Sequence, residues 1–268
     1  MNGSQLLEKN VGKLVTSVGA FFPGERVVFR GYDLHAELKD LDWLELYLLG
    51  ITGRRFTSKQ MKVFHALWTY SNYPDARLWN NRIAALTGTA RSTGTLGIAA
   101  ALAVSEAQLY GWGAVLRVSV FLIRTKAQLD AGEDLKDLVS AEIKRHRGIS
   151  GYGRPIVSAD ERIAPMMALL RETGLDGGAY LKLAFEVEKI LLDGRWRLHM
   201  NYAALSAAIA ADFGLSAYES YFFGIPGFLG GMPPCYLDAA DKPEGQLFPL
   251  PCRMISYEGH KRRRWKTI

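Results

Sequence analysis

The sequence has little cysteine. Cys235 and Cys252 are the only two in 268 residues, and their spacing matches neither a disulfide framework nor a metal-binding motif. This usage is typical of a reducing compartment, and the opening stretch MNGSQLLEKN does not have the pattern of a secretory signal peptide. The sequence therefore predicts a cytoplasmic protein without a structural disulfide or a bound metal.

Nucleotide-binding motifs are also missing. Neither a GxGxxG fingerprint nor a GxxxxGK[ST] loop occurs, and strand-like and helix-like segments do not alternate along the chain. There is no internal repeat and no low-complexity segment. These absences argue against an alternating α/β fold.

Long apolar runs without charge are absent as well. The longest apolar stretch, residues 96–123, contains Glu106 and Arg117, and Gly111 and Gly113 divide it. Charged groups are costly at bilayer depth. We interpret the stretch as two close-packed helices joined near residues 111–113, in a core or a subunit interface, and expect no membrane contact.

The charge balance is modestly basic, with a formal net charge of +6 and a pI near 9.2. Such a surplus suits a small anionic ligand, and it equally suits a solvated basic surface. No recognised nucleic-acid-binding module accompanies it, so we expect no nucleic-acid partner.

What the sequence does contain is the apolar spacing of amphipathic helices. The first such stretch is expected to end at Gly50, and Thr57 or Ser58 is expected to cap the helix that follows it. Further helices are expected over residues 134–147, 177–194 and 201–214. Only ERVVFRG, residues 25–31, has the pattern of a strand, so the predicted fold class is all-α.

Four stretches resemble citrate synthases. The most specific is GERVVFRGYDLHAELKDLDWLELYLLGITGRRFTSKQ, residues 24–60, which is similar to the N-terminal signature of that family. FFGIPGFL and the terminal MISYEGHKRRRWKTI are similar to its later motifs, and ISGYGRPIVSADERI, residues 149–163, is similar to an active-site loop. The resemblance covers most of residues 24–268, although the chain is shorter than a usual member.

This resemblance implies a fold and an assembly. A citrate synthase is an all-helical homodimer with its active site in a cleft between two domains. Here it implies a large, dimer-forming domain from residues 1–112 and 214–268 and a small, ligand-closing domain from residues 113–213. A coenzyme A (CoA) thioester is the implied co-substrate, with no permanently bound cofactor.

The catalytic positions implied by the resemblance have all changed. Ala203 stands where the family has its aspartate base, Tyr110 where it has a histidine donor, and Arg154 where it has a second histidine. Removal of a proton beside a thioester needs a base, and the enolate needs a hydrogen-bond donor. Tyr110 is either such a donor or a buried aromatic, and Arg154 is either an anion ligand or a surface arginine.

Other site residues follow from the same resemblance. Arg162, in the motif DER, corresponds to a substrate-carboxylate arginine, and Arg253 corresponds to a second one. Further candidates are His199 and Asn201 for the substrate, and Gly151, Gly153, Lys261 and Arg262 for the cofactor. The alternative for His199 is an exposed histidine without a ligand. The alternative for Lys261 and Arg262 is a solvated basic terminus.

Two function classes remain open from the sequence. The first is a divergent enzyme of the citrate synthase type that acts on a CoA thioester or a related carbonyl compound. It would form or cleave a carbon–carbon bond, as a lyase, or transfer an acyl group, as an acyltransferase. The second is a non-catalytic, ligand-binding or scaffold relative, which Ala203 favours. Ordinary citrate synthase activity is not expected.

Overall fold

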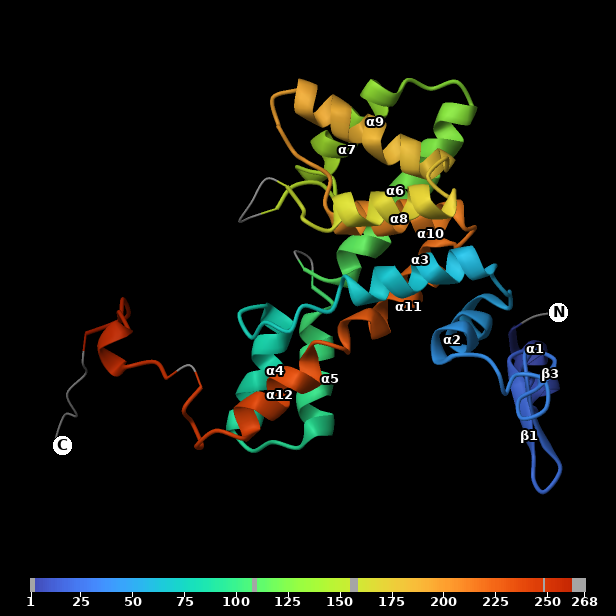
Figure 1. Cartoon of the computed structure of the whole chain (residues 1–268), viewed down its shortest axis with the longest axis horizontal. Coiled ribbons are helices and arrows are strands. Elements are labelled where there is room, and N and C mark those ends of the chain that lie inside the picture. The colour runs from blue at the N-terminus through green and yellow to red at the C-terminus, as the bar shows by residue number, and fades with distance from the viewer. Residues whose placement is uncertain (1–2, 108–109, 155–158, 248, 262–268) are drawn as a thin grey trace. The chain divides into compact units, whose positions relative to one another are not determined.

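The computed structural model describes residues 3–107, 110–154, 159–247 and 249–261 (Figure 1). Its internal contacts divide the chain into two compact units, each formed by two separate stretches. Unit 1 comprises Met1–Tyr73 and Ser105–Gly230, and unit 2 comprises Pro74–Val104 and Gly231–Ile268. The division into a large and a small domain that the resemblance implies stays a prediction.

The N-terminal part of unit 1 contains the strands. After helix α1 (Gly3–Asn10), β1 (Gly19–Phe22), β2 (Arg26–Phe29) and β3 (Tyr32–Asp33) form an antiparallel sheet in that order. In its register Ala20 lies opposite Val28 and Phe29 lies opposite Tyr32. The predicted strand corresponds to β2 and is confirmed. Its two short partners were not predicted.

The sheet is attached to the helix that follows it. The side chain of Arg30 donates from Nε and Nη2 to the carbonyl oxygen of Gly50, at 2.9 and 2.6 Å. A Cβ on Gly50 would lie 2.7 Å from the ring of Phe29, so glycine is needed there for close packing. Gly50 lies inside α2 (Trp43–Thr52), so the predicted helix end at Gly50 is wrong. Gly53, at a φ of 69°, ends the helix instead.

Helices build the rest of unit 1. They are α3 (Ser58–Thr69), α6 (Trp112–Asp130), α7 (Leu135–His146), α8 (Ile163–Thr173), α9 (Ala179–Asp193), α10 (Tyr202–Asp212), α11 (Ala217–Gly224) and the short 3-10 helix η1 (Ile225–Phe228). Thr57 caps α3 through a reciprocal pair with Gln60, so the predicted cap is confirmed. The other predicted helices correspond to α7, α9 and α10, and the predicted all-α class is confirmed.

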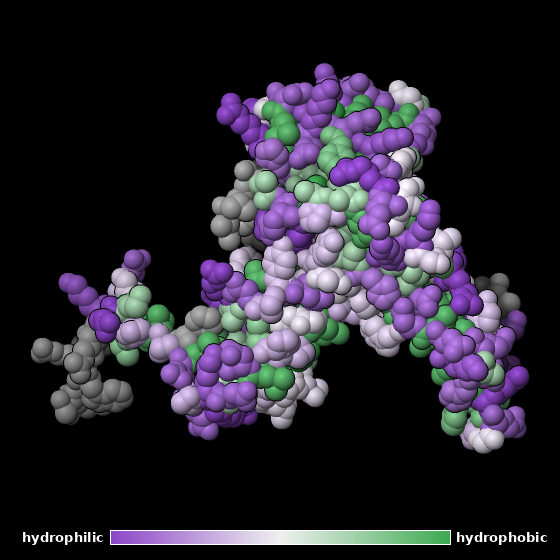
Figure 2. Space-filling view, viewed as in Figure 1, coloured by the Kyte–Doolittle hydropathy of each residue, from purple (hydrophilic) through white to green (hydrophobic). Residues whose placement is uncertain are grey.

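Helix α10 lies in the core of unit 1. Nine of its residues, from Tyr202 to Ala211, are buried, and it packs against α6, α9 and α11. Its many alanines let neighbouring helices approach closely, while Leu205 and Ile209 fill the remaining space. Outer helices are more polar: α7 buries Val139 and Ile143, and hydrophilic residues predominate over α7 and α9 in Figure 2.

Unit 2 is a small helical unit. It contains α4 (Trp79–Thr89), α5 (Gly94–Val104), α12 (Met232–Ala240) and the 3-10 helix η2 (Cys252–Met254). Helix α4 packs against α5 and α12, and Ala85, Cys235 and Ala239 form a core cluster there. Gly88 allows the backbone of Tyr236 to approach α4.

The apolar stretch 96–123 forms parts of two helices, as predicted. They are α5 and α6, and α6 begins directly after Gly111. The two helices belong to different units, so their packing against each other stays a prediction. Within the described ranges of the chain, no helix is both long enough and apolar enough to cross a membrane.

Candidate functional site

The glycine loop at residues 149–154 is fixed to the segment that leads into α10. Gly153 donates its N–H to the carbonyl oxygen of His199 at 2.6 Å, and Asn201 donates its N–H to Gly151 at 2.8 Å. Tyr152 and Met200 form a β-bridge between these two bonds. The loop is therefore held by backbone hydrogen bonds on one side of the start of α10.

Both loop glycines adopt a φ of 88°, which residues with a side chain rarely adopt. A Cβ on Gly151 would lie 2.7 Å from the Cβ of Ala204, and one on Gly153 would lie 3.0 Å from the side chain of Leu198. The close approach that these glycines allow is thus an approach to α10 and to its preceding segment. Their predicted contact with a cofactor stays a prediction.

Asn201 is the N-cap of α10. Its side-chain oxygen accepts a hydrogen bond from the N–H of Ala203 at 2.9 Å, and its Nδ2 donates to Gly153 at 2.8 Å. Both ends of the amide therefore hold the loop against the helix. Ala203 follows in the first turn, half-buried and without an ionisable group.

A cluster of charged and phenolic side chains lies where this loop meets α8. We call Arg154, Asp160, Glu161, Arg162 and Tyr73 the charged cluster. Arg162 is the N-cap residue of α8, and Tyr73 follows α3. The structure therefore brings the predicted residues Arg154 and Arg162 together, along with two carboxylates and a tyrosine that the sequence had not assigned.

Arg162 makes a bidentate ion pair with Asp160. Its Nε and Nη2 donate to the two carboxylate oxygens at 2.8 and 2.7 Å, and the side chain of Asp160 is 0% exposed. The guanidinium also lies 4.4 Å from the ring centre of Tyr202. Burial opposes ionisation of Asp160, but the hydrogen bonds from Arg162 outweigh it and lower the pKa of Asp160.

This ion pair gives Arg162 a structural role. Its guanidinium compensates a buried carboxylate, which also accepts the N–H of Tyr202 at 2.9 Å. Arg162 therefore ties the start of α8 to the start of α10. Its predicted contact with a substrate carboxylate stays a prediction.

Arg154 pairs with the other carboxylate. Its Nη1 lies 2.5 Å from Oε2 of Glu161, while the hydroxyl of Tyr73 donates to Oε1 of Glu161 at 2.6 Å. The hydrogen bond from Arg154 is the main cause of the low pKa of Glu161, about 2. Burial and the bond to Glu161 raise the pKa of Tyr73 to about 12, so this hydroxyl keeps its proton.

Tyr110 lies within the electrostatic reach of Arg162. Its ring stacks on Phe228 with centroids 5.9 Å apart and an angle of 9° between the planes. Burial raises the pKa of Tyr110 to about 12, and the charge of Arg162 opposes that rise. At neutral pH Tyr110 is therefore a protonated phenol, which is able to donate a hydrogen bond.

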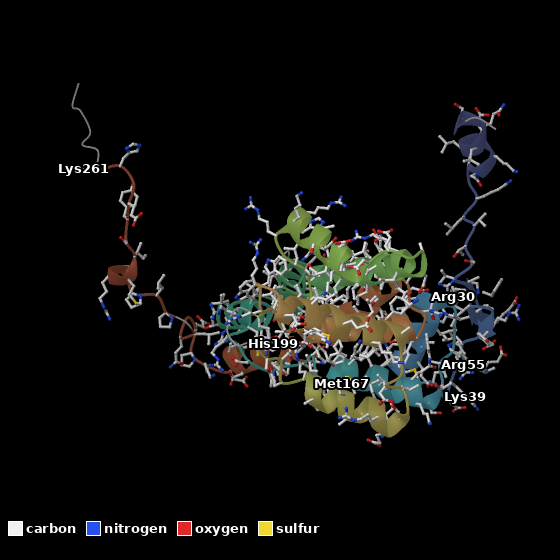
Figure 3. All side chains as sticks on the ribbon, turned by 90° about the horizontal axis from the view of Figure 1, so that it is seen from above. Arg30, Lys39, Arg55, Met167, His199 and Lys261 are labelled. Carbon is white, nitrogen blue, oxygen red and sulfur yellow. The ribbon has the colours of Figure 1, made fainter. Side chains whose placement is uncertain are left out.

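His199 lies on the segment between α9 and α10, and its carbonyl oxygen accepts the N–H of Gly153 in the glycine loop (Figure 3). Its Nδ1 is 3.4 Å from Oε1 of Glu188, and that same oxygen accepts the N–H of Met200 at 2.8 Å. The side chain of His199 is 42% exposed, so its imidazole is accessible to a ligand. Glu188 fixes both the ring and the backbone beside it.

The remaining predicted residues belong to unit 2. Arg253 and Lys261 are exposed on its C-terminal stretch, and Lys261 is labelled in Figure 3. Arg262 lies outside the described residues. The predicted roles of all three stay predictions. Within the described part of the chain, no group of three or more His, Cys, Asp and Glu side chains has the arrangement of a metal site.

A separate cavity of about 350 Å³ opens on unit 1. Its lining includes Arg54 before α3, Tyr180 of α9, Ser216 before α11 and Glu219 of α11. Arg54 already donates to the carbonyl oxygen of Gly214 at 2.9 Å and lies 3.5 Å from Glu219. This cavity contains none of the predicted site residues, and its one lining arginine is already compensated.

The missed residues had a partial signal in the sequence. Asp160 and Glu161 directly precede Arg162, and acidic and basic neighbours in a loop are candidates for an ion-pair cluster. Tyr73 had no such signal, because it joins Glu161 from 88 positions away. Only the folded chain shows that Asp160, Glu161 and Tyr73 belong to one cluster.

Comparison with known proteins gives the fold. No family model and no curated protein matches this sequence. Among solved structures, citryl-CoA lyase from Hydrogenobacter thermophilus superposes with a TM-score of 0.81 at 19% identity, over 94% of this chain and 97% of that one. The chain has the citrate synthase fold.

Larger proteins share the citrate synthase fold with this chain. An ATP citrate lyase from Methanosaeta concilii, in complex with (3S)-citryl-CoA, superposes with a TM-score of 0.74 at 15% identity. The match covers 97% of this chain but 45% of that one. Citrate synthase from Thermotoga maritima gives a TM-score of 0.63 at 17% identity, over 85% of this chain and 61% of that one. The resemblance inferred from sequence is therefore confirmed at the level of the fold.

Proposed function

We propose that this protein is an enzyme that acts on a CoA thioester or a related carbonyl substrate, forming or cleaving a carbon–carbon bond or transferring an acyl group. The observation that carries the proposal is the end-to-end likeness to a citryl-CoA lyase, which covers 97% of that chain. Of carbon–carbon bond formation and cleavage, we favour cleavage, because this chain and the citryl-CoA lyase are similar in length. A CoA thioester would be a co-substrate and not a permanently bound cofactor.

Tyr110 is the proposed electrophilic donor. Charge develops on the thioester oxygen when the adjacent carbon loses a proton or a carbon–carbon bond breaks. A protonated phenol near that oxygen stabilises the charge, and the raised pKa of Tyr110 keeps its proton in place at neutral pH. Stacking on Phe228 fixes the plane of the ring.

Arg154 and Arg162 are the proposed anion ligands, since guanidinium groups match carboxylates and phosphates. His199 and Asn201 would line the same site from the segment before α10, and Gly151 and Gly153 are proposed to let the CoA thioester approach the loop closely. Arg253 is proposed for the substrate, and Lys261 and Arg262 for the phosphates of CoA.

The alternative is a non-catalytic ligand-binding relative, and one observation favours it. Neither carboxylate of the charged cluster is a good base near neutral pH, because Asp160 is buried in an ion pair and Glu161 has a pKa of about 2. Ala203 supplies none either. A base would have to come from His199 or from the substrate itself.

Isotope exchange separates the two functions. We expect the protein to exchange the α-protons of acetyl-CoA for deuterium in heavy water, with the exchange followed by mass spectrometry. Tyr110→Phe should slow the observed reaction about 10²- to 10³-fold, the usual cost of one such donor. Tyr218→Phe, at an exposed position on α11, is the matched control and should have no effect. Calorimetric binding of acetyl-CoA without this exchange would support the non-catalytic alternative.

We also propose a homodimer located in the cytoplasm. Leu96, Ala99, Ala100 and Ala103 are exposed on α5 at the spacing of one helix face, and Leu96 is 64% exposed. An exposed apolar stripe of small residues suits close packing against a second copy. Light scattering at micromolar concentration should give about twice the chain mass of 29.8 kDa. Leu96→Glu should shift the protein towards monomer, and a monomeric wild type would contradict the proposal.

A further inference from the structure

The charged cluster carries equal numbers of positive and negative groups. Arg154 and Arg162 are its cations, and Asp160 and Glu161 are its anions. Each arginine has its own carboxylate within hydrogen-bonding distance, at 2.5 Å for Arg154 and 2.7 Å for Arg162. A ligand that approaches the cluster therefore meets a site whose formal charge is zero, although it contains two guanidinium groups.

The two carboxylates have different surroundings. Asp160 is fully buried, holds Arg162 with both oxygens and accepts the N–H of Tyr202, so it is part of the framework. Glu161 is 54% exposed, and its two oxygens bind one side chain each, Arg154 and Tyr73. Glu161 is thus the carboxylate that a ligand contacts, and it is the group that sets the net charge of the exposed part of the cluster.

We propose that Glu161 is the specificity-determining residue of this site. By neutralising Arg154 it selects a neutral or singly charged carbonyl substrate and rejects dicarboxylates. This inference rests on the proposed function, since it concerns the compound that reacts together with, or is released from, the CoA thioester.

The physical basis is repulsion combined with competition. A ligand with a single carboxylate has the cluster's partly exposed arginines as donors and gains little by displacing Glu161. A second carboxylate has to displace Glu161 from two hydrogen bonds with strong donors or lie beside a like charge. Discrimination of this kind acts through a repulsive group built into the site and not through an added attraction.

The persistence of this charge follows from the same contacts. Arg154 and Tyr73 both donate to Glu161, and the raised pKa of Tyr73 keeps the proton on its hydroxyl at neutral pH. Glu161 is held at a fixed position facing Arg154 and does not lose its charge over the physiological range. The discrimination against dicarboxylates should therefore be nearly constant between pH 6 and pH 8, as expected for a group with a pKa of about 2.

A charge-neutral variant tests the inference. Glu161→Gln keeps the shape of the side chain and one hydrogen-bond acceptor, but it leaves Asp160, 4.0 Å away and already paired with Arg162, as the carboxylate near Arg154. Binding of malate and lactate, a dicarboxylate and a monocarboxylate with the same 2-hydroxy acid group, is measured by calorimetry. We expect Glu161→Gln to bind malate about tenfold or more tightly than the wild type does, at the scale of one charged hydrogen bond. Lactate affinity should change much less.

The matched control is Glu172→Gln. Glu172 is in the last turn of α8, ten residues from Arg162 and so about 15 Å along the helix, and it pairs with Lys62. The substitution Glu172→Gln removes the same charge from unit 1 and should leave malate binding unchanged. Glu161→Ala, which also removes the charge, should behave like Glu161→Gln. Agreement between the two variants would show that the effect does not come from misfolding of one of them.

Two outcomes would overturn the inference. One is equal malate binding, or no malate binding, in the wild type and in both Glu161 variants with unchanged melting curves. The other is a similar gain in Glu172→Gln, which would point to overall charge. Acetyl-CoA binding to the same proteins is a separate measurement: its absence would count against the proposed function, whereas the malate comparison would still decide the role of Glu161.

Discussion

A mixture of acetyl-CoA and oxaloacetate should release CoA at the background rate when this protein is added. The resemblance to citrate synthases puts Ala203, Tyr110 and Arg154 at the positions of the three catalytic groups. Each such group typically contributes about 10²- to 10⁴-fold to the rate. The losses are not additive, but a combined deficit of at least about 10⁴-fold is expected.

Release of the CoA thiol, detected with a thiol reagent, measures this rate. The protein itself contributes a small initial signal, because Cys252 is exposed, whereas burial raises the pKa of the Cys235 thiol and slows its reaction. A blank without oxaloacetate removes that signal. Turnover near 10 s⁻¹, about the median for enzymes, would mean that the alignment of Ala203 or the role given to its position is wrong.

Replacing Arg162 by alanine should lower the free energy of unfolding of unit 1 by about 3–5 kcal/mol, the usual cost of breaking a buried ion pair. The variant leaves Asp160 buried without its bidentate partner. It also removes the cation that packs against Tyr202 at the start of α10. Denaturant unfolding followed by circular dichroism measures the change.

Arg171→Ala is the control for this variant. Arg171 lies in the last turn of α8 and is exposed, so its loss should change stability by no more than about 0.5 kcal/mol. A double variant that also carries Asp160→Ala should be less destabilised than the sum of the two single variants, because no unpaired charge remains. If Arg162→Ala unfolds like the wild type, the ion pair does not contribute to the fold as the structure indicates.

Local sequence signals predicted those features of the fold that local interactions decide. The cap at Thr57 and the helices that became α9 and α10 depend on neighbouring residues and on apolar spacing. Gly50 was assigned incorrectly for a tertiary reason. A glycine near a helix end is a common stop signal, but here the ring of Phe29 packs where a Cβ of residue 50 would lie, and this favours a glycine inside the helix. The two-residue strand β3 exists only because β2 pairs with it.

The candidate site was predictable in outline for the same reason. The loop glycines and the proximity of Arg154 to Arg162 follow from positions close together in the chain. The pairing within the charged cluster does not. Whether Asp160 or Glu161 is buried depends on the N–H of Tyr202 and the hydroxyl of Tyr73, which come from distant elements. The difference between a framework carboxylate and a ligand-facing one is therefore visible only in the folded chain.

The discontinuity of unit 2 matters during synthesis. Helices α4 and α5 leave the ribosome early, whereas α12, which packs on both, follows only after residues 105–230 have been made. At about 5–20 residues per second this delay lasts on the order of ten seconds. Throughout it, Ala85 and Gly88 lack the cover of Cys235 and Tyr236. The nascent α4–α5 pair therefore lacks the packing of α12 for as long as translation of the intervening segment takes.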